Sequence, residues 1–254
     1  MIIDTHAHLM LDQFEGELDA VIERAKAAGV EKIINVGCDL KSCKQAVEML
    51  SVDDCLYATL GLHPYDAADA TDAVMADWEK QIKDNERIVA IGECGLDYFK
   101  AEVPKDVQEK AFRLQLELAQ SLNIPIIIHN READDDCLKI MDDYKVGAVF
   151  HCYGSTAEFA RKLWYRGIYT SFTGIITYPK SEELQAVVDE VPMDLFMVET
   201  DCPYLAPQKY RGERNEPAYV TEVVAKIGEL KNLPEKDVAR ISTENASEFF
   251  LRMA

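Results

Sequence analysis

The chain has 254 residues, of which 48% are hydrophobic and 29% are charged. These values are typical of a globular protein with a sizeable core and exclude disordered and collagen-like chains. Acidic residues outnumber basic residues by 46 to 27, so the formal net charge is −19. A protein this acidic repels long polyanions unless its positive charge is local, which disfavours functions that coat duplex DNA.

Location and redox state follow from simple sequence features. No apolar run approaches the roughly 18 residues of a membrane span, and the segment MIIDTHAHLM is followed by acidic residues in place of an apolar signal core. We therefore expect a cytoplasmic protein that does not associate with membranes. The seven cysteines are an odd number without Cys-x-x-Cys spacing, which indicates reduced, packed thiols and not disulfides or a zinc knuckle.

Short β-rich runs alternate with longer stretches of helical periodicity along the chain. The runs predict strands at residues 2–6, 32–37, 56–61, 88–93, 125–129, 148–151, 168–172 and 195–199. Between them apolar residues recur at helical spacing, as in the run from Ala111 to Leu122. Gly29 is placed to end the first helix, whereas Pro104 and Pro217 are placed to begin later ones.

Eight such units in about 250 residues match the size of a single α/β domain, the (β/α)8 or TIM barrel. The pattern alone also leaves a distorted or seven-stranded barrel open. No linker or low-complexity segment interrupts the alternation, so we expect one domain over residues 1–254. The carboxyl ends of the strands of such a barrel converge on the face that carries the active site.

All five histidines lie at predicted carboxyl ends of strands. They are His6, His8, His63, His129 and His151. Purely structural histidines would also occur on the outer helices, because histidine is an ordinary surface residue. Alternate residues of a strand face the same side, so both imidazoles of the His-x-His pair can bind one ion. This placement predicts a metal site at the C-terminal face of the barrel.

Two carboxylates also lie at predicted carboxyl ends of strands. Glu93 ends the fourth predicted strand, and Asp201 follows the eighth. The combined ligand set is larger than a single catalytic ion uses, so we predict two divalent ions. The predicted ligands are His6, His8, Glu93, His129, His151 and Asp201. A carboxylate can bridge two ions, which makes Glu93 the predicted bridge; an ion pair of Glu93 with an arginine is the alternative without metal.

Catalytic and metal chemistry follow from these ligands. Asp201 is placed both to bind the first ion and to accept a proton from the attacking water. Glu199 faces the same side, two residues earlier, and either supports a ligand or contacts the substrate. We expect zinc, manganese or magnesium, and four imidazoles suit the first two better than the third.

Positive charge gathers near the predicted active face. Arg131 follows His129 by two residues, and Arg211 and Arg214 lie in the segment KYRGERNEP after the last strand. A guanidinium can bind phosphate oxygens in a bidentate manner. For Arg131 an ordinary salt bridge is equally open, and a solvated loop is the alternative for the other two.

Six groups of residues together resemble the TatD family of metal-dependent hydrolases. In chain order they are DTHAHL, GLHPYDA, GECGLDYF, IIIHNREA, FHCYGS, and ETDCPYLAP with RGERNEP. The resemblance spans nearly the whole chain and implies an amidohydrolase-like barrel with metal-dependent deoxyribonuclease activity, commonly exonucleolytic. The sequence departs from the family pattern at CYGS, where a Cys-Phe-Ser-Gly type is expected, and at Asn130, where serine is commoner.

The resemblance also implies roles for individual residues. It implies two ions that share Glu93, the first held by His6, His8 and Asp201 and the second by His129 and His151. His63 is implied to contact substrate phosphate or a further ion. The two departures from the family pattern lie beside ligands, so they concern local substrate contacts and leave the metal ligands unchanged.

We therefore expect a deoxyribonuclease that cleaves phosphodiester bonds at DNA strand ends, or in short oligonucleotides, with Asp201, Glu93 and His63 as its catalytic residues. Arg131, Arg211, Arg214, Glu199 and His63 are the expected substrate contacts. Hydrolysis of a small cyclic amide or of an aminoacyl ester on tRNA is the alternative on the same site. A metal-stabilised binding protein without turnover is disfavoured. Such a protein needs no general base, whereas Asp201, Glu199 and His63 supply several candidates for one. No obligate protein partner is expected.

Overall fold

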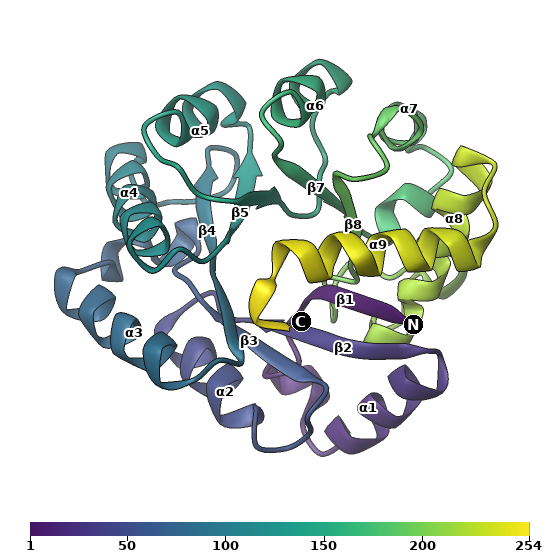
Figure 1. The fold of residues 1–254 in the computed structure, drawn as a ribbon, viewed down its shortest axis with the longest axis horizontal. Coiled ribbons are helices and arrows are strands. Elements are labelled where there is room, and N and C mark those ends of the chain that lie inside the picture. The colour runs from purple at the N-terminus through teal and green to yellow at the C-terminus, as the bar shows by residue number, and fades with distance from the viewer. Residues whose placement is uncertain (254) are drawn as a thin grey trace. The chain divides into compact units, whose positions relative to one another are not determined.

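The computed structural model describes residues 1–253, which form eight strands and the helices that connect them (Figure 1). The strands make one sheet in chain order: β1 (Ile2–Ala7), β2 (Val30–Val36), β3 (Leu56–Leu60), β4 (Ile88–Asp97), β5 (Ile126–Arg131), β6 (Ala148–Phe150), β7 (Tyr169–Phe172) and β8 (Phe196–Val198). Parallel strands in this order, each followed by a helix, are those of a (β/α)8 barrel. The predicted fold class is confirmed with eight strands.

The helices fall where the periodicity predicts them. They are α1 (Leu18–Ala27), α2 (Leu40–Met49), α3 (Asp72–Asp84), α4 (Lys105–Leu122), α5 (Asp134–Met141), α6 (Ala157–Trp164), α7 (Glu182–Glu190), α8 (Val220–Lys231) and α9 (Glu235–Phe249). Gly29 lies just past α1 with φ +88°, and Pro104 is the N-cap of α4. Pro217 instead begins a 3-10 turn, Pro217–Tyr219, that precedes α8. None of these helices is long and apolar enough to cross a membrane.

The chain divides into two compact units. The first contains residues 1–35 and 152–248, and the second contains Val36–His151 with the residues from Phe249 onward. In the second unit α2 to α5 cover one face of the strands (Figure 1). All seven cysteines are free thiols in the structure.

In the first unit the end of β1 lies beside the segment that follows β8. Ala7 and Cys202 form a parallel bridge, and the backbone N–H of Asp201 donates to the carbonyl of His6 over 2.8 Å. At the other end of these strands, α9 is held by the Asn245 amide, which donates to the carbonyl of Phe196 over 2.8 Å. The metal-ligand candidates of the two strands are therefore brought together at their carboxyl ends.

In the second unit β4 is buried along all ten of its residues. The predicted strand ended at Glu93, but β4 continues to Asp97 because Cys94, Gly95, Leu96 and Asp97 pair with residues 128–131 of β5. Gly95 has φ +142°, and a Cβ there would overlap the carbonyl oxygen of His129. Only glycine allows this close pairing. Glu93 consequently lies inside β4, and the prediction that it closes the strand is wrong.

Candidate metal centre

His6, His8 and Asp201 bring their polar atoms together in the first unit. The two Nε2 atoms of the histidines are 3.2 Å apart, and Asp201 Oδ1 lies 3.3 Å from His8 Nε2 and 3.8 Å from His6 Nε2. Each residue offers one ligand atom to a group that spans less than 4.8 Å. Two imidazole nitrogens and one carboxylate oxygen form a donor set that fits a divalent transition metal.

Asp4 joins the two segments that carry this group. It is fully buried and accepts hydrogen bonds from the backbone N–H of Thr200 over 2.9 Å and from its hydroxyl over 2.6 Å. Burial raises the pKa of Asp4 to about 7, although the bonds from Thr200 oppose that shift. Because Asp4 precedes His6 by two residues and Thr200 adjoins Asp201, the contact fixes the ligands relative to one another.

Glu199 is buried under the same group. Its Oε1 accepts from the backbone N–H of Cys152 over 2.7 Å, and its Oε2 accepts from the Ser171 hydroxyl over 2.6 Å. Ser171 is on β7, and Cys152 follows β6. Both carboxylate oxygens thus accept from the protein, which is the geometry expected of a residue that supports the site.

Glu93 lies among three imidazoles in the second unit. Its Oε1 is 2.8 Å from His129 Nδ1, 2.7 Å from His151 Nε2 and 3.6 Å from His63 Nε2. Burial alone would raise the pKa of Glu93, but His151, His63 and His129 outweigh it and hold that pKa well below the usual range. The carboxylate is therefore charged. Glu93 with His129 and His151 gives a second set of carboxylate and imidazole donors, one that fits a second ion.

Asp97 completes the surroundings of His129 and was not predicted. Its Oδ2 is 3.2 Å from His129 Nε2, on the other side of the imidazole from Glu93, and accepts from the Tyr65 hydroxyl over 3.2 Å. Burial raises the pKa of Asp97, but hydrogen bonding to His129 and the backbone N–H of Lys100 reverses the shift and lowers it. A carboxylate on the second nitrogen of a ligating histidine orients the ring. The four-residue spacing from Glu93 in one strand is the signal that could have identified it.

His63 has its ring 4.2 Å from that of His129, between centroids. Its Nδ1 accepts from the backbone N–H of Tyr65 over 3.2 Å, so the proton of the neutral ring lies on Nε2. Burial lowers the pKa of His63 to about 3, even though the charge of Glu93 opposes the shift. The imidazole is neutral near pH 7 and directs an N–H toward Glu93.

The three arginines proposed to bind phosphate differ in their surroundings. Arg131 is stacked 4.1 Å above the Phe99 ring, and Arg211 is stacked 4.2 Å above the Tyr178 ring. Arg214 instead forms an ion pair of 2.8 Å with Glu17 and donates to the carbonyl of Gln13 over 2.6 Å. Its charge is already balanced by a carboxylate.

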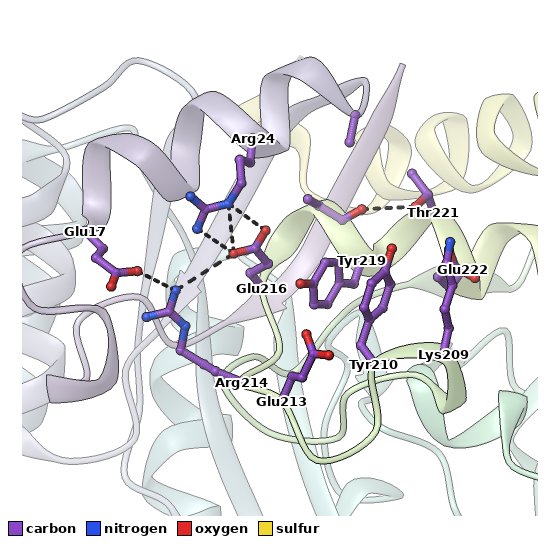
Figure 2. Close-up of a pocket in the computed structure, with 12 residues that line it drawn as sticks. Glu17, Arg24, Lys209, Tyr210, Glu213, Arg214, Glu216, Tyr219, Thr221 and Glu222 are labelled. Atoms are coloured by element: carbon purple, nitrogen blue, oxygen red, sulfur yellow. Dashed lines mark hydrogen bonds and ion pairs between the residues drawn. The ribbon is translucent and has the colours of Figure 1, made fainter.

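Arg214 belongs to the wall of a hollow of about 720 Å³ beside α1 (Figure 2). The cations of this wall are paired, Arg24 with Glu216 over 2.7 Å and Lys209 with Glu222 over 2.7 Å. Figure 2 shows Glu216 between Arg24 and Arg214, with a dashed line to each. The hollow thus offers no free cation for a phosphate. The pairs of Arg214 and Glu216 fasten the RGERNEP loop to α1 and its N-cap, and Lys209, just before that loop, is fastened to α8.

Asn215, also missed by the sequence reasoning, fastens this loop to the segment around Asp201. It is fully buried, and its amide donates to the carbonyls of Thr200 over 2.8 Å and Tyr204 over 2.6 Å. These two carbonyls lie one residue before and three residues after Asp201, so Asn215 holds the backbone on both sides of that residue. Its only signal in the sequence was an asparagine among the charged residues of RGERNEP.

Replacing Asn215 with alanine is expected to lower the free energy of unfolding by about 2–4 kcal/mol, because the buried carbonyl of Thr200 and the partly buried carbonyl of Tyr204 lose their donor. Denaturant unfolding measures the change. Gln208→Ala is the control, since Gln208 is an exposed amide in the same loop and should change stability by no more than about 0.5 kcal/mol. Equal stability of the two variants would show that Asn215 does not anchor the loop.

Known proteins match this chain over nearly its whole length. The family model described as TatD related DNase matches residues 3–251. The uncharacterized metal-dependent hydrolase YabD of Bacillus subtilis is 45% identical over 98% of this chain and 99% of its own length. The protein of Cronobacter sakazakii named 3'-5' ssDNA/RNA exonuclease TatD is 31% identical over 100% of this chain and 99% of its own.

A solved structure gives the same result for the fold. The TatD homologue YJJV of Escherichia coli superposes with a TM-score of 0.92 at 28% identity, covering 98% of each chain. The family model, the relatives and this structure each span nearly the whole sequence. The chain therefore belongs to the TatD family of metal-dependent hydrolases.

Proposed function

We propose that this protein is a TatD-type deoxyribonuclease that hydrolyses phosphodiester bonds at the ends of single-stranded DNA. The observation that carries the proposal is the pair of ligand groups, one of His6, His8 and Asp201 and one of Glu93, His129 and His151. Two Cronobacter relatives, 31% and 32% identical, are named 3'-5' ssDNA/RNA exonucleases. That name supports a nucleic acid substrate and an action at strand ends for this chain.

The proposed centre holds two divalent ions, zinc, manganese or magnesium. One is assigned to His6, His8 and Asp201 and the other to His129 and His151, with Glu93 as a ligand of both. The bridging role rests on the convergence of strand ends in a (β/α)8 barrel and on the two oxygens of a carboxylate. When bound, the ions would supply positive charge and Lewis acidity for the attack of water on the phosphodiester.

The chain's own residues have distinct proposed tasks. Asp201 accepts the proton of the attacking water. His63 donates its Nε2–H to a phosphate oxygen, since its Nδ1 is occupied by the Tyr65 backbone N–H. Arg131 and Arg211 bind phosphate or neighbouring groups of the strand. Arg214 can act on substrate only by leaving Glu17, so we assign it mainly to holding its loop.

A linear single-stranded oligonucleotide is expected to be degraded while a circular single strand of the same sequence persists. Non-specific binding along a strand requires many distributed cations, which a chain of net charge −19 lacks. Substrate must therefore be held at its end, by the ions and a few residues. Gel analysis of both DNAs after digestion with manganese or magnesium measures the difference, which we expect to exceed about tenfold.

The same assay separates the proposal from the other reactions that this site could perform. Equal loss of linear and circular strands would refute the requirement for an end. A different outcome would assign the site to ester or amide hydrolysis: neither DNA is degraded, and the metal-loaded protein turns over small cyclic amides or aminoacyl esters.

A further inference from the structure

Two arginines stand apart from the others in this protein. Of its ten arginines, eight donate to a carboxylate or carbonyl oxygen: Arg24, Arg87, Arg113, Arg161, Arg166, Arg214, Arg240 and Arg252. Within residues 1–253, the guanidinium groups of Arg131 and Arg211 have no such acceptor and lie on aromatic rings. A free cation is unexpected in a chain with 46 acidic residues.

Arg131 and Phe99 together present an exposed, flat and positively charged surface. The guanidinium carbon lies 4.1 Å from the ring centroid. Phe99 is 59% exposed, although a phenylalanine would normally be covered. Tyr65, in the segment after β3, is also exposed, but its hydroxyl donates to Asp97.

The backbone fixes this surface beside the ligands of the second group. Arg131 pairs with Asp97 in the β4 and β5 register, and the backbone N–H of Tyr98 donates to the Arg131 carbonyl over 2.9 Å. The N–H of Phe99 donates to Asp97 over 2.9 Å. Arg131 follows His129 by two residues in one strand, so their Cα atoms are about 6.6 Å apart along the strand. That distance is comparable to one nucleotide step.

We propose that Phe99 and Arg131 form a stacking site for a nucleobase of the single-stranded substrate, about one nucleotide from the cleaved phosphodiester. The proposal rests on the proposed nuclease function. Aromatic rings and guanidinium planes stack on any base, so such a site binds single strands without reading their sequence. A base that is paired and stacked within a duplex cannot reach it, which favours frayed or single-stranded ends.

The test compares a normal single-stranded oligonucleotide with one that carries abasic residues near the cleaved end. For Phe99→Ala we expect KM on the normal strand to rise about tenfold, as loss of one stacked base predicts, with kcat changed less than twofold. On the abasic strand Phe99→Ala should match the wild type. Phe99→Trp should restore the wild-type KM, because tryptophan keeps the stacking face.

Tyr165→Ala is the matched control, since Tyr165 is 91% exposed at the C-cap of α6 and should leave both KM values unchanged. Binding of the two oligonucleotides to metal-loaded Asp201→Asn protein, by fluorescence anisotropy, gives a readout without turnover. Equal effects of Phe99→Ala on normal and abasic strands, or none on either, would overturn the stacking site while wild-type cleavage of DNA continued. Absence of cleavage and binding by the wild type would instead overturn the nuclease function itself.

Discussion

Asp201→Asn is expected to lower the rate of hydrolysis at least about 100-fold while the fold stays intact. The lost function is that of a general base, for which losses of about 100- to 10,000-fold are usual, and weaker metal binding adds to it. Asparagine keeps the shape of the side chain. The backbone N–H of Asp201, which donates to the His6 carbonyl over 2.8 Å, is unaffected. Turnover with saturating metal and thermal unfolding measure the two effects.

The control for Asp201 is Asp194→Asn, which makes the same change of charge at an exposed residue before β8. It should retain wild-type turnover. If metal-replete Asp201→Asn protein also turned over at nearly the wild-type rate, the base would be another residue. His63 and Glu199 are the candidates, and since both Glu199 oxygens already accept hydrogen bonds, His63→Ala would be tested next.

Glu93→Ala is expected to bind fewer than two divalent ions and to lose activity that added metal does not restore. The Glu93 carboxylate lies within 2.8 Å of His129 and His151, so its removal takes the anionic ligand from the second group and, by the proposed bridge, from the first. Metal analysis of protein dialysed after loading with zinc or manganese gives the ion count, and titration calorimetry gives the affinities.

Glu86→Ala controls for the loss of one negative charge, because Glu86 is exposed just before the amino end of β4. That variant should keep the wild-type ion count and activity. Two ions bound by Glu93→Ala with undiminished affinity would show that Glu93 bridges nothing. If the variant lost one ion and kept the other at full affinity, Glu93 would be a ligand of only one of the two ions.

Local patterns determined most of the fold. Alternating strand and helix periodicity identified all eight strands, because the faces of strands and helices bury apolar residues at fixed spacings. The order of parallel strands then placed the histidines and Asp201 at one end of their strands. The extension of β4 to Asp97 escaped prediction because it depends on pairing with β5 through Gly95. The added residues, CGLD, include a glycine and an aspartate and do not read as a strand by themselves.

The supporting residues were decided by contacts between distant segments. Asp4 meets Thr200 across 196 positions of sequence, and Arg214 meets Glu17 across 197. The sequence alone treats Arg131, Arg211 and Arg214 as equivalent cations, since a residue's own neighbours do not show which carboxylates reach it. The sequence by itself determined which side chains can bind metal, because their types and strand positions are local properties. Only the tertiary structure decided which charges remain free for a substrate, because ion pairing depends on whichever segments the fold brings within a few ångströms.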